Sequence, residues 1–391
     1  MAHSPALRHR HTHGHHHSSV HGFLPLLSVL KKNIVLTVAA VAALLTTFAV
    51  PVDRAYLEYF DFKTLTCLFC VLAVVCALKN IRFFYTLAQK IVRCFRTARL
   101  SILALVYITF IGSMLIANDM ALLTFLPLGF FVLHSTGKER YMAFTFIMQN
   151  IAANLGGMLT PFGNPQNLYL YSYFHIPTGE FCRIMLPAFL LAVALLIAAC
   201  LPLKPIRFSI DETYGEKLNV RKTILYSLLF LASVLIVFRL IPFVVGLAVI
   251  PVILFFADRD SLKMVDYGLL GTFFFFFIFA GNLARLEAVN ALVSSWLERD
   301  TLLVSVLSCQ FISNVPSAIL LSRFTEDYPA LLLGVNIGGT GTLIASLASL
   351  ITFSEFRLLH PEQTKKYLGI FAAANGAFLL ILTVAAKLFW A

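Results

Sequence analysis

The sequence predicts an all-α, polytopic membrane protein built from inverted repeats, with two re-entrant helical hairpins and two broken transmembrane helices. Of its 391 residues, 59% are apolar and 13% are charged, whereas an ordinary soluble domain has roughly 45–50% apolar and about 25% charged residues. Long runs of the chain contain no charge, and similar glycine-containing strings occur in both halves. A water-soluble fold could not bury this much apolar surface, so the composition excludes a soluble enzyme.

Seven continuous spans are predicted, because a helix needs about 20 apolar residues to cross a bilayer. Two longer apolar stretches, 141–173 and 329–352, contain Gly, Pro and Asn and are predicted to cross as broken helices. The continuous spans are 34–52, 62–78, 184–203, 223–240, 242–257, 264–283 and 367–390. Together these segments give nine crossings.

Two further apolar stretches have a polar break at their middle and are predicted to enter the membrane and return on the same side. The first, 100–134, is interrupted by Ala117-Asn118-Asp119, and the second, 301–323, by Ser313-Asn314-Val315-Pro316. Each follows an amphipathic segment, 79–99 or 284–298, that is expected to lie on the membrane surface. We call these stretches the first and the second hairpin.

The distribution of Lys and Arg tests this layout, because cytoplasmic loops of membrane proteins carry the excess. With the N-terminus inside, the inner loops and the tail hold 22 Lys and Arg, and the outer side holds eight. The net charge of +11 is therefore attributed to cytoplasmic loops, and no basic motif with interleaved aromatic residues predicts nucleic-acid binding. The predicted location is the plasma (inner) membrane, with a cytoplasmic N-terminus and an external C-terminus.

Four regions are predicted along the chain: a mobile His-rich tail with an interfacial segment (1–33), a first inverted repeat (34–203), a cytoplasmic linker (204–222) and a second inverted repeat with one extra span (223–390). The tail holds eight of the eleven His. This bias is typical of an expression tag or a solvated tail, although imidazoles at such density also chelate divalent metal ions. The first span is interpreted as retained, with a signal sequence as the alternative.

An internal repeat is visible in two fifteen-residue strings, 154–168 and 336–350. They share five identities at matching positions, namely Asn, Gly-Gly, Thr and the final Leu. The same order of elements also recurs in both halves: an amphipathic segment, a hairpin, a broken helix and a closing span. Five crossings separate the two hairpins, and because five is odd the hairpins enter from opposite faces. This arrangement is the inverted repeat of secondary transporters.

The breaks in the two helices predict a binding site. Gly and Pro interrupt the backbone hydrogen-bond ladder and free carbonyl and amide groups at membrane depth. A bound cation can take the carbonyls, whereas half-helix N-termini carry about half a positive charge and favour an anion. Polar side chains at the breaks and tips complete an uncharged site: Asn118, Asn154, Thr160, Asn164, Asn167, Ser313, Asn314, Asn336, Thr340, Thr342, Ser346 and Ser349. The alternative is close helix packing, which also uses small residues.

Asp119 is the acidic residue at the first hairpin tip. An ionised Asp at mid-bilayer costs about 2.5–3.5 kcal/mol, so this carboxyl should be protonated, paired or next to a cation. We interpret it as a ligand of the coupling ion or as a proton acceptor. The alternative is a tip that reaches the inner water layer, where the charge costs little.

These strings resemble the ion transporter superfamily, with its citrate-transporter-like, divalent anion/sodium symporter, arsenite permease and sodium/proton antiporter branches. The resemblance covers residues 30–390. Residues 117–127 look like the first hairpin tip of the family, and the string from Gly156 to Asn167 looks like its first broken helix. Residues 313–316 and 336–342 are similar to the second pair. The symporter branch has Ser-Asn-Thr at each tip, whereas Asn118-Asp119 resembles the arsenite and antiporter branches.

The resemblance implies a homodimer in which outer spans form a fixed scaffold, while hairpins and broken helices slide across the membrane with substrate and ion. Implied cation sites are Asn118, Asp119, Asn154, Gly156, Gly157, Thr160 and Gly163 in the first half, and Ser313, Asn314, Asn336, Gly338, Gly339, Thr340 and Thr342 in the second. The anion would lie between them, against Asn118, Asn164, Pro165, Asn167, Asn314, Ser346 and Ser349.

The predicted function is secondary active transport of a small anion, with a carboxylate as the expected class, coupled to sodium ions or protons. The alternative within the same fold is a sodium/proton antiporter or an arsenite efflux permease. A membrane-embedded enzyme would need a nucleophile, a base or paired carboxylates facing one cavity. The spans offer one hairpin Asp and scattered Cys, so no enzyme, resident cofactor or metal centre is predicted.

Overall fold

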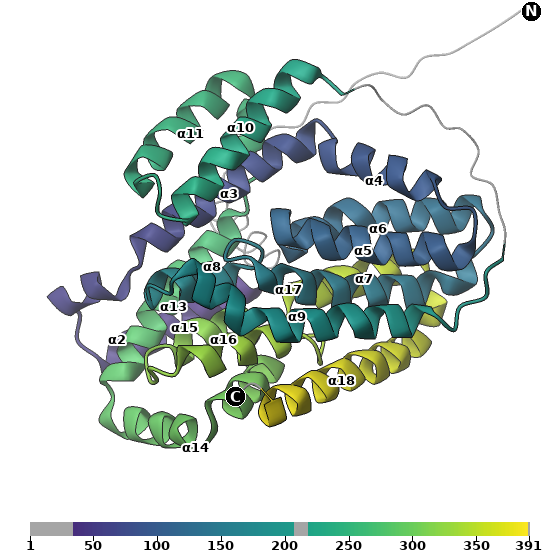
Figure 1. Ribbon diagram of the computed structural model, residues 1–391. Coiled ribbons are helices and arrows are strands. Elements are labelled where there is room, and N and C mark those ends of the chain that lie inside the picture. The colour runs from purple at the N-terminus through teal and green to yellow at the C-terminus, as the bar shows by residue number, and fades with distance from the viewer. Residues whose placement is uncertain (1–33, 207–217, 390–391) are drawn as a thin grey trace, which may run out of the picture.

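The computed structural model describes residues 34–206 and 218–389, and within these ranges every regular element is a helix (Figure 1). The predicted all-α, polytopic class is thereby confirmed. The predicted tail (1–33) and most of the predicted linker lie outside the described residues. Seven helices are long and apolar enough to cross a membrane: Phe62–Asn80, Ala98–Ile116, Asn118–Ser135, Thr178–Cys200, Val220–Val237, Tyr267–Arg285 and Pro361–Phe389.

Each predicted continuous span appears as one helix: α2 (Ile34–Ala49), α3 (Phe62–Asn80), α9 (Thr178–Cys200), α10 (Val220–Val237), α11 (Phe243–Ala257), α13 (Tyr267–Arg285) and α18 (Thr364–Phe389). Two of them, α2 with 16 residues and α11 with 15, are shorter than predicted and are not among the seven helices above. The start of α9 precedes the predicted boundary at residue 184. Polar residues extend the helix there, because the Glu180 carboxylate accepts a hydrogen bond from the Tyr328 hydroxyl (2.6 Å). Shorter elements connect the spans: η1 (Arg54–Tyr59), α4 (Phe83–Arg93), η2 (Glu139–Tyr141), α12 (Arg259–Lys263) and η4 (Pro361–Gln363).

Both hairpins turn at a residue with a left-handed backbone. The first consists of α5 (Ala98–Ile116) and α6 (Asn118–Ser135), and Ala117 at its tip has φ +64°. The second consists of the end of α14 (Glu287–Ile312), which bends at Asp300, and α15 (Asn314–Leu321). Its tip residue Ser313 has φ +75°. Such angles are uncommon for residues with a side chain, so the two tips share one strained conformation.

The arms of the two hairpins differ in length. In the first hairpin α5 has 19 residues and α6 has 18, which is long enough for a full crossing. In the second, α15 has only 8 residues. A hairpin with two full crossings returns the chain to its starting side, as a re-entrant one does. The predicted sides of the loops are therefore independent of how deep the first hairpin reaches.

The two broken helices are interrupted at the predicted places. The first consists of α7 (Met142–Gly156), η3 (Gly157–Leu159) and α8 (Pro165–Tyr173). Pro165 starts α8, where a missing N–H does not disturb the helix. The second consists of α16 (Tyr328–Ile337) and α17 (Leu347–Leu359), and Gly341 between them has φ +117°. The end of α17 passes the predicted limit because Phe356 stacks on Tyr367 of α18, with ring centroids 4.3 Å apart.

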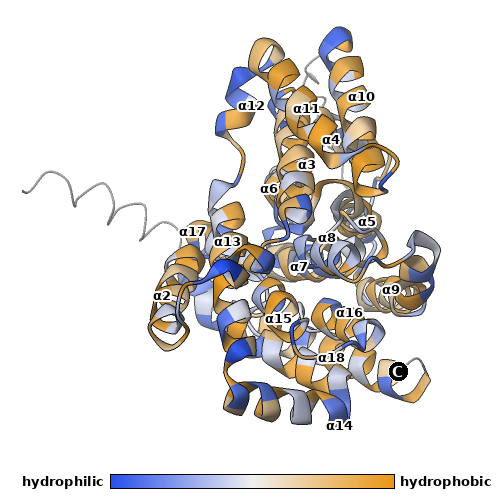
Figure 2. Cartoon of the chain, turned by 90° about the vertical axis from the view of Figure 1, so that its left-hand side faces the viewer, coloured by the Kyte–Doolittle hydropathy of each residue, from blue (hydrophilic) through white to orange (hydrophobic). Residues whose placement is uncertain are grey.

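The broken helices lie at the centre of the molecule. In Figures 1 and 2, α3, α10 and α11 lie together on one side of them, and α14 and α18 lie on the opposite side. In each half, the first hairpin arm packs on the first part of the broken helix, α5 on α7 and α14 on α16. The second arm packs across, α6 on α17 and α15 on α8. Because the second arm of each hairpin packs on the broken helix of the other half, the two breaks lie close to each other.

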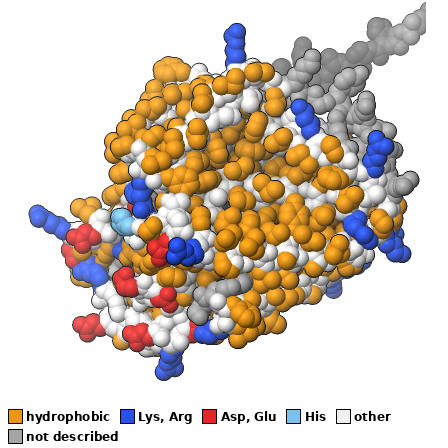
Figure 3. Space-filling view, in the orientation of Figure 1, with side chains coloured by type: hydrophobic (Ala, Val, Ile, Leu, Met, Phe, Trp, Pro, Cys, Tyr) orange, Lys and Arg blue, Asp and Glu red, His pale blue; other side chains and the backbone are white. Residues whose placement is uncertain are grey.

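The surface has a hydrophobic band between two charged ends (Figure 3). Many large apolar side chains of the described residues are exposed, among them Phe256, which is 83% exposed. Contiguous exposed apolar surface of this kind needs lipid or another chain against it. Among the exposed charges, Asp53 accepts two hydrogen bonds from Arg285 (2.7 and 3.0 Å), which hold the pKa of the Asp53 carboxyl below its ordinary value.

Candidate functional site

The first hairpin tip meets both broken helices at one buried amide. Asn118 Nδ2 donates a hydrogen bond to Asn154 Oδ1 (3.1 Å), near the end of α7. The same oxygen accepts a second hydrogen bond from the Ser346 hydroxyl (2.7 Å), which precedes α17. All three side chains are buried. Asn154 therefore joins the first tip, the first break and the second break.

A second amide, Asn336, makes the corresponding connection from the other half. Asn336 Nδ2 donates to Asn167 Oδ1 (2.6 Å), and Asn336 Oδ1 accepts from Asn164 Nδ2 (3.2 Å) and Gln166 Nε2 (3.4 Å). Asn164 Nδ2 is also within hydrogen-bond distance of the Asn154 carbonyl oxygen (3.2 Å). We call this set of buried amides, together with Asn118 and Ser346, the central amide network. It is polar and uncharged, as the sequence predicted.

Equivalent contacts hold each break against its own hairpin. The Thr160 hydroxyl donates to the Met114 carbonyl oxygen (2.7 Å), and the Thr342 hydroxyl donates to the Gln310 carbonyl oxygen (3.0 Å). Thr342 follows Thr160 by 182 residues, the offset of the sequence repeat. Met114 and Gln310 each stand four residues before the Asn of their tip. The two halves therefore use the same anchoring contact at matching positions.

Glycines mark the closest approach of break and hairpin. A Cβ atom on Gly156 would lie 2.1 Å from the Phe110 carbonyl oxygen and 2.5 Å from Ser113 Oγ. A Cβ atom on Gly338 would lie 2.9 Å from Cys309 Sγ. Ser113 and Cys309 again occupy matching places, five residues before the tip Asn. The same glycines therefore allow the helices to pack closely and form the edges of the breaks. Close helix packing and a binding site at the breaks are thus compatible interpretations of the repeat.

Amide groups cap the free carbonyls of both breaks. In the first break, Asn167 Nδ2 donates to the carbonyl oxygens of Gly157 (3.1 Å), Met158 (3.2 Å) and Thr160 (3.3 Å). In the second, Gln310 Nε2 donates to those of Gly338 (2.9 Å) and Thr340 (3.1 Å). The Gln310 orientation is fixed because its Oε1 accepts from the Thr342 N–H (2.9 Å). Each set of carbonyls thus converges on one nitrogen.

Asp119 lies in the first turn of α6, beside the central amide network. Its side chain is half-buried, and its Oδ1 atom is buried and has no hydrogen-bond partner among the described residues. A buried carboxyl oxygen without a donor is unusual in a folded protein. In this position it can accept a proton or a cation without displacing an existing contact.

The predicted residues do not all reach the central amide network. Ser313 and Asn314 at the second tip instead contact the Ala345 carbonyl oxygen, through Ser313 Oγ (3.3 Å) and the Asn314 N–H (2.9 Å). The Thr340 hydroxyl bonds within its own turn, to Ile337. The remaining residues line the edges of the breaks: Gly163 packs on the Gly157 carbonyl, Gly339 lies beside the Asn314 amide, and the Ser349 hydroxyl donates to Asn150 Oδ1 (3.4 Å).

Three residues of the site were not predicted: Asn150, Gln166 and Gln310. Asn150 stands one turn before Asn154, on the same helix face. Gln310 stands one turn before Asn314 in an otherwise apolar hairpin arm. A search for polar residues four positions from each predicted Asn would have found both. Gln166 lies inside the Gly-Asn-Pro-Gln-Asn string, and only the three-dimensional structure shows that it reaches Asn336.

Asn336→Ala is expected to lower the melting temperature of the purified protein and to weaken anion binding. The variant leaves the buried partners of Asn336 without one hydrogen bond each, at about 1–3 kcal/mol per group. Thermal unfolding in detergent measures the loss. Asn290→Ala is the control, because this half-buried amide bonds only within its own segment, to Ala284 (3.0 Å) and Ser294. Equal melting temperatures for the two variants would contradict the role of Asn336.

Comparison with known proteins identifies the family. A family model described as citrate transporter matches residues 25–328. An uncharacterized transporter of Methanocaldococcus jannaschii is 32% identical over 340 residues, which cover 84% of this chain and 90% of that protein. The inner membrane protein YbiR of Escherichia coli is 28% identical over 336 residues, which cover 84% of this chain and 89% of that protein. The helical fold with its paired hairpins and breaks, together with these matches, shows that the chain belongs to the citrate transporter family.

Proposed function

We propose that this protein is a secondary active transporter of a small anion, with a carboxylate as the expected class, driven by protons or sodium ions. The observation that carries the proposal is the central amide network, where the first hairpin and the two broken helices meet around buried, uncharged donors. The second hairpin tip is held beside it, on the Ala345 carbonyl oxygen. Membership of the citrate transporter family supports transport of a citrate-like anion. The class of the substrate, the identity of the coupling ion and the transport mechanism all belong to this proposal.

An anion is favoured by the direction of the helices at the centre. The second hairpin arms and the second parts of the broken helices, α6, α15, α8 and α17, all begin at the tips or breaks. A helix N-terminus carries about half a positive charge and free N–H groups, which attract anions. Substrate contacts are proposed at Asn118, Asn164, Pro165, Asn167, Asn314, Ser346 and Ser349.

Coupling through Asp119 favours protons. The break carbonyls that would coordinate a sodium ion already accept hydrogen bonds from Asn167 and Gln310. Sodium binding would require these amides to move away, whereas protonation of Asp119 requires no rearrangement. An anion and a neighbouring carboxylate also repel each other, so neutralisation of Asp119 would make the anion bind more tightly.

An elevator-type movement is proposed from the packing. Equivalent contacts at matching positions in both halves support an inverted repeat. The central amide network joins the first hairpin to both broken helices, and Gln310 and Asn314 join the second hairpin to the second broken helix, so that these elements would move as one body. Helices α3, α10 and α11 would stay fixed, and the exposed apolar faces of α10 and α11 suit a homodimer within the bilayer.

Uptake into liposomes tests the proposal. Purified protein is reconstituted and given labelled citrate, succinate or sulfate, with an inward gradient of protons or of sodium ions. We expect carboxylate accumulation that follows the proton gradient. Failure with every anion in both gradients would refute the proposal. Sodium-driven proton flux without an anion, or arsenite efflux, would select the alternative that the Asn118-Asp119 pair suggests.

A further inference from the structure

Arg239 connects the helices that are proposed to stay fixed, α3, α10 and α11, with the hairpins and broken helices, which form the proposed moving body. It follows α10, at the corner that leads into α11. Its Nη2 atom donates a hydrogen bond to the Tyr171 carbonyl oxygen of α8 (2.6 Å), and its guanidinium lies over the Tyr171 ring, 4.5 Å from the centroid. Tyr171 belongs to the last turn of α8, where a helix carries partial negative charge and favours a cation.

The backbone at Arg239 is unusual for an arginine. Helix α10 ends in a Schellman motif, in which the Leu240 N–H donates to the Leu235 carbonyl oxygen (2.9 Å) and the Arg239 N–H donates to that of Ile236 (3.0 Å). Arg239 occupies the left-handed position of this motif with φ +65°, a position that is usually held by glycine. Strain of this kind persists where the surrounding structure enforces it, and it concentrates at functional sites. The end of the helix alone does not require an arginine here.

Helix α10 also contacts the first break through aromatic rings. Phe162 lies in the break and meets the Phe230 and Phe238 rings edge to face, with centroids 6.3 and 5.9 Å apart. Phe230 and Phe238 are eight residues apart and share one face of α10. Apolar contacts are non-directional, so they tolerate sliding along this face. The hydrogen bond of Arg239 is directional and is lost once donor and acceptor are more than about 3.5 Å apart, so it belongs to one position of the body.

The partners of this hydrogen bond stay satisfied when it opens. The Tyr171 carbonyl oxygen also accepts a hydrogen bond from the Ile176 N–H (3.2 Å). Arg239 is exposed, so its released guanidinium would be hydrated. Release would be costly if it left a buried polar group without a partner, and neither group is left so. The contact is therefore suited to open and close as the body moves.

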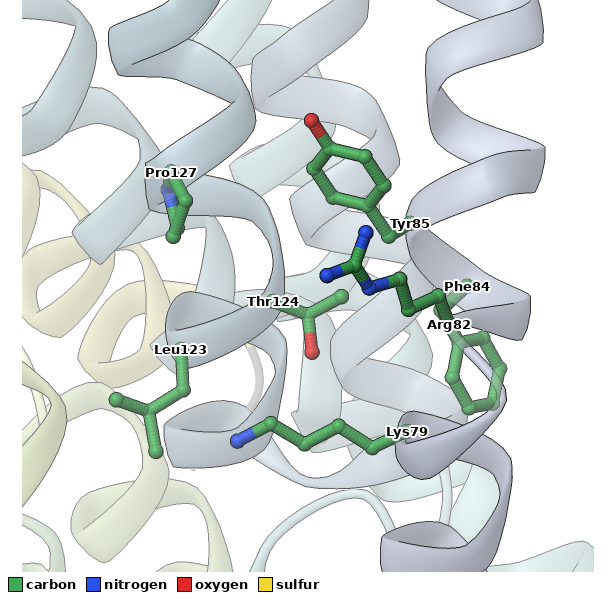
Figure 4. A pocket seen from close by; sticks show the side chains of 7 residues that line it. All are labelled: Lys79, Arg82, Phe84, Tyr85, Leu123, Thr124 and Pro127. Carbon is green, nitrogen blue, oxygen red and sulfur yellow. The ribbon is translucent and has the colours of Figure 1, made fainter. Parts of the chain in front are cut away.

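A cleft separates the fixed helices from the moving body at the side that the Lys and Arg distribution assigns to the cytoplasm (Figure 4). It has a volume of about 360 Å³ and lies between the corner that joins α3 to α4 and one face of α6. Leu123 and Pro127 of α6 line it opposite Tyr85. Arg239 lies near the predicted outer ends of the spans. The two bodies are thus joined by Arg239 at the outer end and separated by the cleft at the inner end.

We propose that Arg239 is a latch, which holds the moving body at the outer end of the fixed helices while the inner cleft is open. When the body slides away from this position, the hydrogen bond from Arg239 to Tyr171 breaks and the cleft between α6 and the α3–α4 corner closes. This role rests on the proposed elevator-type movement, whereas the contacts that form the latch involve neither substrate nor coupling ion. Arg239 is therefore a positioning residue.

A thiol in the inner cleft reports on the latch at the opposite end. Leu123→Cys is made in a Cys94→Ser, Cys182→Ser background, which removes the two free thiols that are not buried. The protein is placed in lipid nanodiscs, where both faces are accessible, and labelling by a charged maleimide is timed without substrate. Arg239→Gly removes the guanidinium and supplies the residue that the motif favours. We expect it to slow labelling severalfold, because the body leaves the position in which the cleft is open. Arg239→Lys, which keeps a donor, should slow labelling less.

Arg259→Gln is the matched control, because this exposed arginine lies over the Phe255 ring of its own segment (4.9 Å) and should leave labelling unchanged. Unfolding cannot imitate the expected result, since it would speed labelling. Labelling of Arg239→Gly that is as fast as in the parent protein, or faster, would overturn the latch even if the protein takes up carboxylates. Slower labelling in a protein that takes up no anion would support the latch, while the transport function failed by its own test.

Discussion

Asp119→Asn is expected to abolish accumulation of the anion against its gradient, while the protein remains folded and binds the anion. A gradient of one pH unit supplies about 1.4 kcal/mol per coupled proton, which corresponds to about tenfold accumulation. The amide cannot take up a proton, so this factor is lost and internal and external concentrations become equal. Labelled anion in liposomes, followed to steady state under an imposed pH gradient, measures the ratio.

Asp119→Glu and Asp260→Asn are the matched controls. The first keeps a carboxyl at the tip, and the second removes a carboxyl from the short α12, where Asp260 pairs with Lys263 (2.8 Å). Both should retain accumulation, with a reduced rate in the glutamate variant because the longer side chain is displaced. If Asp119→Asn accumulates the anion like the unmodified protein, the carboxyl has no part in coupling. It would then be a tip residue exposed to water.

Gly156→Ala is expected to cause the largest loss of stability among the glycine variants. Its Cβ would lie 2.1 Å from a backbone oxygen of α5, and a backbone atom cannot turn aside as a side chain does. Overpacking of this kind costs typically about 1–3 kcal/mol. The first hairpin and the first break would separate, and transport would stop. Melting temperature and uptake are the two measurements.

Three other glycines calibrate this effect. Gly338→Ala should be milder, because the atoms nearest to its added Cβ, the Gly334 carbonyl oxygen at 2.8 Å and the Cys309 Cβ and Sγ at 2.9 Å, lie farther away than the 2.1 Å at Gly156. Gly179 and Gly376 have no atom within 4 Å of an added Cβ. Alanine there should be neutral or stabilising by up to about 1 kcal/mol, since alanine favours helix. A melting temperature for Gly156→Ala as high as that of Gly376→Ala would refute the close contact.

Local signals were sufficient for the elements of this fold. Pro165 begins α8 and Gly341 adopts φ +117° because of their own backbone chemistry, and the hairpin turns fall at the polar tips that the sequence marks. Helix ends were less predictable, since they depend on neighbours. Glu180 extends α9 through a contact with Tyr328, and Phe356 extends α17 through a contact with Tyr367.

The connections within the site could not be predicted from the chain alone. Asn167 was assigned to substrate, and in the structure its Nδ2 caps the carbonyls of its own break. Gln310 does the same for the second break from a different helix. Both contacts depend on how closely a hairpin approaches a break, which no spacing along the sequence reports.

If the two hairpins open toward opposite faces of the membrane, as the proposed inverted repeat requires, their unequal second arms make the two faces different for a transported solute. The wall formed by α6 has 18 residues and that formed by α15 has 8, so one is longer by about 15 Å. Detailed balance fixes the ratio of inward to outward flux at equilibrium, but it does not fix the individual rates. In the proposed transporter, release toward the α6 side would therefore follow the longer wall. The half-times for unloading should consequently differ between right-side-out and inverted vesicles.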